Sequence, residues 1–256
     1  MVYGFVGTGT ITEAMIDGMM TSELCSAQVV VSPRNEVVSS RLAGRYENVT
    51  VAKSNQAVVD ACDVLVLAVR WQVAEQVLTA LEIPSDMKII SVIAATDHQS
   101  LSSWTGVSAT QITRAIPLPF VADREGATAI YPPDAATSEL FGALGTAVCC
   151  ESKKEFDLLA AASSLMGTYF GILDHVNGWM VGKGMAAFKA QSYIKPLLAS
   201  LANHALKSEE SDFSELRKEF STPGGLNQQV FSEFNDQGGN RILLSALDQV
   251  LAKIQS

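Results

Sequence analysis

The chain has 256 residues, of which 48% are hydrophobic and 18% are charged. A disordered protein would be more polar and more highly charged, so this composition indicates one large or two modest folded domains. The formal net charge of −9 argues against a nucleic-acid partner, because an acidic surface repels phosphate backbones.

Neither a membrane partner nor a secretory route is expected. No uninterrupted apolar run reaches the roughly 18–20 residues that cross a bilayer, and the first residues lack the features of a signal peptide. The four cysteines form no CxxC pair and have no metal-ligand spacing with the three histidines. We therefore expect a cytoplasmic protein with no metal site, whose thiols are reduced and mostly buried.

Short β-branched runs alternate with helical stretches through residue 150. The expected strands cover residues 2–6, 28–32, 49–52, 63–69, 88–93, 110–115, 127–131 and 146–150. The expected helices cover residues 10–20, 36–43, 55–60 and 73–81. Such alternation favours a parallel sheet with helices on both faces, which is an α/β fold of the doubly wound, Rossmann type.

The pattern changes after residue 152, and no further strand is expected. Helical periodicity covers residues 155–175, 182–205, 212–220 and 240–254, and the acidic cluster at 209–212 predicts a loop or a helix start. Residues 151–256 carry 10 basic and 12 acidic side chains, so this half is nearly neutral as well as apolar. We predict a dinucleotide-binding domain over residues 1–152 and an all-α domain over residues 153–256 that pairs with a second copy in a homodimer.

A glycine-rich turn, Gly7-Thr8-Gly9-Thr10-Ile11, separates the first expected strand from the first expected helix. Glycines permit a tight turn and let the backbone approach a pyrophosphate, and a helix N-terminus offers that anion free N–H groups. The third glycine of the usual pattern is replaced by Thr12, which is small. A Gly-x-Gly pair alone is weak, but its place inside a βαβ unit predicts a dinucleotide site.

The end of the second strand indicates which dinucleotide is bound. NAD sites usually have an aspartate or glutamate there, whereas this chain reads Ser32-Pro33-Arg34-Asn35. An arginine can hold a phosphate through two parallel hydrogen bonds. We therefore predict NADP(H) as the cofactor, with NAD(H) as the weaker alternative and a solvated loop arginine as the other interpretation of Arg34.

The chain resembles the pyrroline-5-carboxylate reductase family over nearly its whole length. The matching segments are GFVGTGTITEAMIDGM at the start, SPRN, LAVRWQV, SVIAA, RAIP, EGATAIY and STPGG. EGATAIY at mid-chain together with STPGG in a helical half is the most specific combination. Members of that family reduce a cyclic imine acid to proline with NAD(P)H. The resemblance implies an NADP-dependent oxidoreductase acting on CH–NH in proline biosynthesis, a small imine acid as substrate, and a homodimer or a higher oligomer.

The resemblance also implies roles for individual residues. The pyrophosphate would be held by Gly7, Thr8, Gly9, Thr10 and Ile11, the adenosine 2′-phosphate by Ser32, Arg34 and Asn35, and the adenosine by Asn55. Ala68, Val69 and Arg70 would lie beside the cofactor, and Ala94 and Ala95 would border the nicotinamide. The substrate would contact Ser221, Thr222, Gly224, Gly225 and Asn227, among which Ser221, Thr222 and Asn227 are the catalytic candidates.

Three segments depart from the family pattern. Pro117-Leu118-Pro119-Phe120 stands where the family reads Pro-Asn-Thr-Pro, and Leu165-Met166 replaces small residues of its SGSGPAY segment. Asn227 takes the place of a threonine near the imine nitrogen, and an amide is a poor proton donor. These departures leave open a reductase of a different imine or carbonyl acid, or a non-catalytic dinucleotide-binding protein.

Three further assignments stay open at this point. The STPGG segment could be a helix cap, with Ser or Thr at the N-cap and Pro in the first turn, as well as a substrate contact. For His98 a solvated loop residue is favoured over a catalytic one, and for His175 a core or interface position is favoured over a general acid.

Overall fold

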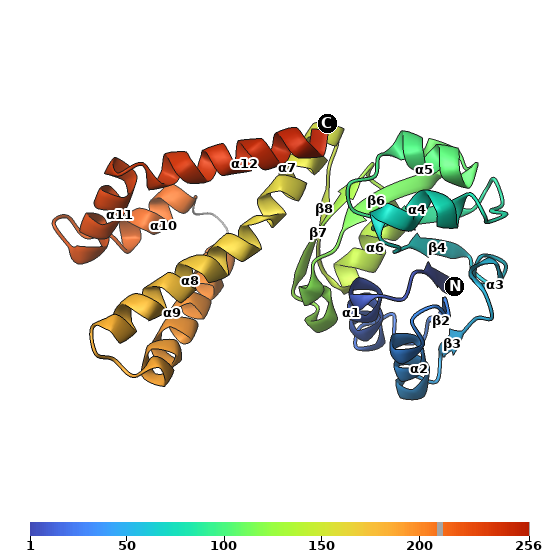
Figure 1. Cartoon of the computed structure of the whole chain (residues 1–256), viewed down its shortest axis with the longest axis horizontal. Coiled ribbons are helices and arrows are strands. Elements are labelled where there is room, and N and C mark those ends of the chain that lie inside the picture. The colour runs from blue at the N-terminus through green and yellow to red at the C-terminus, as the bar shows by residue number, and fades with distance from the viewer. Residues whose placement is uncertain (209–211, 256) are drawn as a thin grey trace. The chain divides into compact units, whose positions relative to one another are not determined.

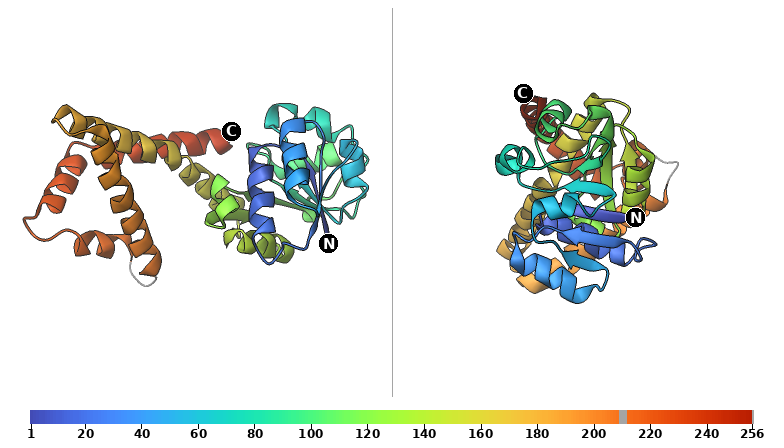
Figure 2. Two further views of the ribbon diagram at one scale, coloured as in Figure 1. Left: turned by 90° about the horizontal axis from the view of Figure 1, so that it is seen from below. Right: turned by 90° about the vertical axis from the view of Figure 1, so that its right-hand side faces the viewer.

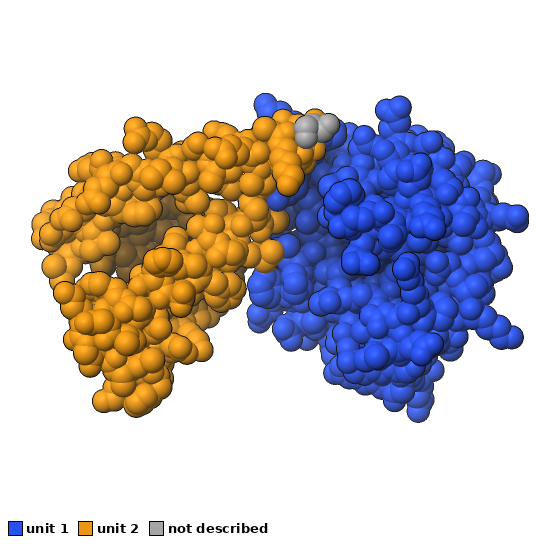
Figure 3. Space-filling model, in the orientation of Figure 1, with its two compact units in different colours: residues 1–160 blue, residues 161–256 orange. Residues whose placement is uncertain are grey.

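The computed structural model describes residues 1–208 and 212–255. The chain divides into two compact units, Met1–Ala160 and Ala161–Ser256, which Figure 3 shows in two colours. The division falls within one helix, α7 (Lys153–Ser163). The boundary expected between residues 152 and 153 stays a prediction. Residues 209–211 of the acidic cluster lie outside the described residues.

The first unit is built on one eight-stranded sheet (Figure 1). The strands are β1 (Val2–Val6), β2 (Gln28–Val31), β3 (Val49–Val51), β4 (Val64–Leu67), β5 (Lys88–Ser91), β6 (Ile112–Ile116), β7 (Gly126–Tyr131) and β8 (Gly145–Cys149). Their order is β3-β2-β1-β4-β5-β6-β7-β8, and every neighbouring pair from β3 to β6 is parallel. This confirms the Rossmann-type expectation, with the strand order reversing beside β1, where such sheets bind ligands.

The sheet is mixed, not wholly parallel as expected. β7 runs antiparallel to β6, with Arg114 opposite Tyr131, and β8 runs parallel to β7. Only residues 117–125 join β6 to β7, and they contain the short 3-10 helix η2 (Pro119–Asp123). A parallel connection needs a crossover of a dozen or more residues, so this link is too short to return the chain to the other end of the sheet.

Helices cover both faces of the sheet, as expected. They are α1 (Thr10–Met20), α2 (Glu36–Arg45), α3 (Asn55–Val59), α4 (Trp71–Leu78), α5 (His98–Thr105) and α6 (Ala135–Ala143), with the 3-10 turn η1 (Ala109–Gln111) before β6. Alternate residues of β4 point to opposite faces: Val64 and Val66 join the core under α1, α2 and α6, whereas Leu65 and Leu67 join the core under α3, α4 and α5. A central strand buried on both sides explains the continuous apolar run read from the sequence.

Helices α5 and α6 were not expected, although the chain marks both starts. Asp97 accepts a hydrogen bond from the Ser100 amide at 2.7 Å, and Asp134 accepts one from the Thr137 amide at 2.8 Å. An aspartate at the N-cap stabilises a helix start by about 1 kcal/mol. Both helices are short, so their periodicity is weak and the caps are the stronger sequence signal.

The second unit is helical throughout its described part, as expected (Figure 2). After the end of α7 its helices are α8 (Leu165–Gly182), α9 (Ala187–Lys207), α10 (Phe213–Glu219), α11 (Leu226–Asp236) and α12 (Gly239–Gln255). A helix at α11 was expected only as the one that STPGG opens, without bounds. No described residue of α8, α11 or α12 is buried, although all three carry many apolar side chains. A unit that leaves so much apolar surface uncovered needs a partner surface.

One helical segment passes the length and composition test for a membrane span. It is Lys153–Gly182, with a window of mean hydropathy 1.4 of which 17% is buried. This segment is not an uninterrupted apolar run, because Asp174, His175 and Asn177 interrupt it. A helix whose apolar surface is covered by a second copy passes the same test, so the segment is weak evidence for a membrane.

The four cysteines are all free thiols, but the expectation that they are mostly buried is wrong for two of them. Cys25 and Cys149 are exposed, whereas Cys150 is buried and Cys62 is half-buried. Cys25 lies in the turn after α1, and Cys149 ends the edge strand β8, where its Sγ lies 3.1 Å from Ser138 Oγ of α6. Burial raises the pKa of the Cys62 thiol to about 11, which makes it a poor nucleophile at neutral pH.

Candidate functional site

The glycine turn lies where β1 ends and α1 begins. Gly7 has φ +105°, and a Cβ there would come within 2.5 Å of the Ala68 carbonyl oxygen and 2.7 Å of the Val69 nitrogen. Gly9 is the N-cap of α1 and has open space around its Cβ position. No side chain caps the helix, so the first amides of α1 are free to meet a ligand. The turn therefore fits a pyrophosphate on the Gly9 side.

The hydroxyl of Ser32 holds this turn from the end of β2. The Gly7 amide donates to Ser32 Oγ at 2.9 Å, and Thr8 Oγ1 donates to the Ser32 carbonyl at 2.7 Å. Thr12, at the third glycine position, donates its hydroxyl to the Gly7 carbonyl at 2.6 Å. Ser32 is only 1% exposed. Its hydroxyl therefore positions the turn, and the expectation that it also contacts a 2′-phosphate stays a prediction.

Arg34 and Asn55 lie on one cavity of about 440 Å³. Its lining includes Arg34, Ser54, Asn55, Gln56, Gln76 and Leu81. The guanidinium of Arg34 is exposed and has no described ion pair. Asn35 caps α2, accepting from the Val38 amide at 3.5 Å. The cavity joins the loop after β2 to α3 and α4, which is the place expected for an adenosine. The glutamines were missed because no motif marks them.

The ends of β4 and β5 complete the cofactor face. Arg70 is the N-cap of α4 and is exposed, and Ala68 and Val69 contact the glycine turn through their backbone. Ala94 and Ala95 form an exposed turn after β5, which is paired with β4. The expected cofactor residues of the first unit therefore gather at the carboxyl ends of neighbouring strands, where doubly wound sheets bind ligands.

Ala95 has a left-handed backbone, with φ +51°. An alanine in this region is strained by about 1–2 kcal/mol, and glycine is not, although glycine also gains freedom in the unfolded chain. We expect Ala95→Gly to raise the free energy of unfolding by about 0.5–1 kcal/mol. The control Ala94→Gly, at a position without positive φ, should lower it by a similar amount. Equal shifts in denaturation midpoint for the two variants would contradict this account.

The STPGG turn of the second unit precedes α11. Gly224 has φ +72°, and Gly225 is the N-cap of α11, so the cap is a glycine and not Ser221 or Thr222. A Cβ at Gly225 would collide with Thr222 Oγ1. The first amides of α11 thus have no side-chain cap, and both hydroxyls stand before a helix N-terminus that favours an anion such as a carboxylate.

Asn227 closes this turn. Its Nδ2 donates to the Phe220 carbonyl at 2.7 Å, and Gln228 Oε1 accepts from the Gly224 amide at 2.6 Å. One N–H of the Asn227 amide is therefore used within the chain, so its part in a substrate contact falls to its second N–H and its oxygen. The five expected substrate residues lie together in this segment.

The two open histidines differ in their surroundings. His175 is exposed on α8, with Nδ1 2.9 Å from the Gly171 carbonyl, so it is not a core residue of this chain. The other part of the expectation, an interface position, stays a prediction. His98 is the first residue of α5 and half-buried, so it is not the solvated loop residue that was favoured. Among residues 1–208 and 212–255, no group of three or more His, Cys, Asp or Glu side chains could hold a metal ion.

The fold and the glycine turn define a Rossmann-type dinucleotide-binding domain followed by a helical domain. Residues 2–95 match a family described as NADP oxidoreductase, coenzyme F420-dependent, and residues 153–256 match pyrroline-5-carboxylate reductase dimerisation. A pyrroline-5-carboxylate reductase of Pseudomonas aeruginosa is 25% identical over 254 residues, covering 95% of this chain and 92% of the relative.

Two solved structures share the fold of the whole chain. The 1-pyrroline-5-carboxylate reductase of Streptococcus pyogenes has a TM-score of 0.82 at 22% identity, covering 99% of this chain and 98% of its own. A pyrroline-5-carboxylate reductase of Coxiella burnetii has a TM-score of 0.86 at 19% identity, covering 99% and 97%. The helical half therefore matches the dimerisation family of pyrroline-5-carboxylate reductases, and the whole chain is similar to such reductases over nearly its full length. The chain is an oxidoreductase that uses a nicotinamide dinucleotide, and its helical domain is a dimerisation domain.

Proposed function

We propose that this protein reduces 1-pyrroline-5-carboxylate to L-proline with NADPH, as a homodimer in the cytoplasm. The observation that carries the proposal is a relationship that runs through both halves of the chain, over 95% of its length, to pyrroline-5-carboxylate reductases. Assembly beyond the dimer belongs to the same proposal.

In this proposal the first unit binds the cofactor and the segment before α11 binds the substrate. The amides at the start of α1, with Gly7 and Gly9, bind the pyrophosphate, and the Arg34 cavity binds the adenosine end. When bound, the reduced nicotinamide supplies the hydride. Ser221, Thr222 and the first amides of α11 bind the substrate carboxylate and fix its orientation. A protonated imine is already electrophilic, so the chain's contribution is placement and the exclusion of water, which fits a site without paired carboxylates.

Arg34 determines the preference for NADPH in this proposal. We expect Arg34→Ala to weaken NADPH binding by about 1.5–3 kcal/mol, roughly 10- to 150-fold, and to leave NADH affinity nearly unchanged. The readout is a fluorescence titration of each nucleotide. Arg41→Ala removes the same charge from α2, where Arg41 pairs with Glu13, and should not change either affinity. Unchanged NADPH affinity in Arg34→Ala would show that the phosphate is held elsewhere.

A second candidate is the reduction of a different imine or carbonyl acid. Leu118, Leu165 and Met166 stand where the family has smaller or more polar residues, and Asn227 holds the turn through Phe220. This candidate keeps the cofactor site and changes only the substrate. A non-catalytic dinucleotide-binding protein is the third, and it also keeps the cofactor site.

The deciding experiment is steady-state oxidation of NADPH with pyrroline-5-carboxylate and with a panel of other cyclic imines and keto acids. Saturable turnover of pyrroline-5-carboxylate with the highest kcat/KM supports the proposal. A higher kcat/KM for another imine supports the second candidate. Tight NADPH binding with no turnover of any panel member supports the third.

A further inference from the structure

The side chain of Gln228 lies on the STPGG turn, and the proposed function gives it no role. Its Oε1 accepts a hydrogen bond from the Gly224 amide at 2.6 Å. Gln228 is the third residue of α11, a position from which a glutamine side chain reaches back to the backbone before the helix. Gly224 is itself one of the five residues expected to contact the substrate. A donor that is expected for the substrate carboxylate is therefore already in use within the chain.

The two atoms of this contact are identified by their chemistry. A backbone N–H only donates, so the atom of Gln228 that faces Gly224 is the carboxamide oxygen and not the nitrogen. A carboxamide oxygen is a planar sp² acceptor, as is each oxygen of a carboxylate. Gln228 thus places on the Gly224 amide the same kind of atom that a bound carboxylate would place there.

The other amides of the turn differ from that of Gly224. The Gly225 amide donates to the Thr222 carbonyl at 2.9 Å, which closes the turn. The first amides of α11, from Leu226 on, have no side-chain cap and no acceptor within the helix. An anion at this helix start gains the Gly224 amide as a further donor only when Gln228 releases it. Gly224 and Gln228 are both exposed, so small ligands reach the contact from solvent.

We propose that Gln228 competes with the substrate carboxylate for the Gly224 amide, holding it in the ligand-free chain and leaving it when the carboxylate binds. This inference rests on the proposed function, because it takes the STPGG turn as the carboxylate site. A hydrogen bond to an ionised acceptor is roughly twice as strong as one to a neutral acceptor, so the carboxylate displaces the carboxamide. The neutral bond that is given up weakens carboxylate binding by about 2- to 12-fold.

A helix cap is the other role that this contact fits, and the two roles predict opposite results. As a cap, Gln228 orders the turn for its ligand, so its removal weakens carboxylate binding. As a competitor, it blocks a donor, so its removal strengthens binding. Gln228→Glu separates the roles again. A glutamate is favoured in the first turn of a helix and caps well, but it holds the Gly224 amide more tightly and repels the substrate carboxylate.

The test measures two constants in the full-length protein: KM for pyrroline-5-carboxylate, and the dissociation constant of L-proline by calorimetry without cofactor. Gln228→Leu removes the acceptor and keeps a side chain that suits a helix. We expect both constants to fall about 2- to 12-fold in this variant. The value of kcat should change less than about twofold, because the competition affects only binding. Gln228→Glu should raise both constants at least about tenfold.

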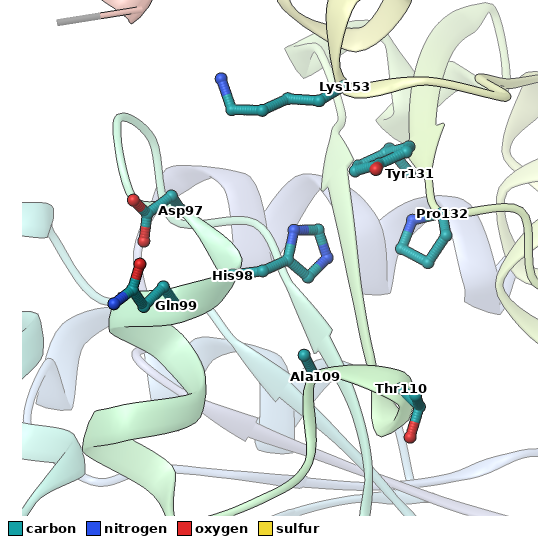
Figure 4. Close-up of a pocket in the computed structure, with 8 residues that line it drawn as sticks. All are labelled: Asp97, His98, Gln99, Ala109, Thr110, Tyr131, Pro132 and Lys153. Carbon is teal, nitrogen blue, oxygen red and sulfur yellow. The ribbon is translucent and has the colours of Figure 1, made fainter.

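Two controls make the test specific. Gln229 follows directly on α11, but its Nε2 donates to Glu233 Oε1 at 3.0 Å, so Gln229→Leu should change neither constant. The ammonium of Lys153 also attracts carboxylates, and it lines a cavity of the first unit (Figure 4). Lys153→Gln keeps a donor for Asp157 and should leave L-proline binding unchanged. Retained NADPH affinity shows that each variant is folded.

The inference is overturned if Gln228→Leu raises both constants or leaves them unchanged, if Gln229→Leu lowers them equally, or if Lys153→Gln abolishes L-proline binding. Failure of the proposed function shows separately, as no turnover of pyrroline-5-carboxylate by the unchanged protein. The KM comparison is then made with the imine or keto acid that is turned over, because each acid carries the same carboxylate. If no acid is turned over, L-proline binding decides: tighter binding by Gln228→Leu supports the inference, and no gain or no binding overturns it.

Discussion

Gly7→Ala is expected to destabilise the first unit by about 3 kcal/mol and to abolish dinucleotide binding. Two causes act together. The residue has φ +105°, which strains any side chain, and a Cβ would press into the backbone of Ala68 and Val69 at the end of β4. The β1–β4 contact lies at the centre of the sheet and cannot move without disturbing its neighbours.

Gly9→Ala is the matched variant, because it adds the same methyl group two residues later. A Cβ at Gly9 meets nothing within 4 Å, and its φ of −107° suits alanine, so the stability cost should stay below about 1 kcal/mol. The methyl group would instead occupy the space where a pyrophosphate approaches the helix. We therefore expect NADPH affinity to fall at least tenfold while the protein stays folded.

Thermal unfolding and NADPH titration of both variants separate the two roles of the glycines. The expected pattern is a large loss of Tm for Gly7→Ala only, and a loss of affinity for both. If Gly9→Ala bound NADPH as tightly as the unchanged protein, the dinucleotide would not lie on that side of the turn. If Gly7→Ala had an unchanged Tm, the close approach of β1 to β4 would not be a constraint.

The sequence predicted the central part of the sheet well, because each element there carries its own signal. Val2–Val6 and Thr10–Met20 have the observed bounds of β1 and α1, since an apolar run and an amphipathic stripe meet at the glycine turn. The reversal of β7 was missed, although the nine residues between Ile116 and Gly126 already exclude a parallel crossover. Connection length would have predicted the mixed sheet.

In the candidate site, too, features that are local in the sequence are easier to predict than contacts between distant residues. The glycine turn and STPGG are each contiguous in the sequence, so a motif is enough to predict them as sites. The hydrogen bond from the Gly7 amide to Ser32 spans 25 positions, and the cavity around Arg34 brings in Gln76 from α4. No local pattern specifies such contacts, which arise only when parallel strands bring their ends together.

We expect the substitution Trp179→Glu to separate the homodimer into monomers. The variant should lose turnover and keep NADPH binding. Ile172, Val176 and Trp179 lie at i, i+4 and i+7 on α8 and form one apolar row, and Trp179 is 65% exposed within the chain. The row lies in the segment that matches the dimerisation family.

Buried tryptophans often contribute 2 kcal/mol or more to an interface, and a glutamate adds the cost of burying a charge. The dimer dissociation constant should therefore rise at least about thirtyfold, as measured by sedimentation over a range of protein concentrations. Phe120→Glu places the same charge on an apolar residue of the first unit, 46% exposed, and should leave the dimer intact. A Trp179→Glu protein that stays dimeric would place the partner surface on another face of the helical unit. Loss of turnover with NADPH binding retained would show that the cofactor site folds without dimerisation. It would also show that the reaction needs the dimer of the helical domain.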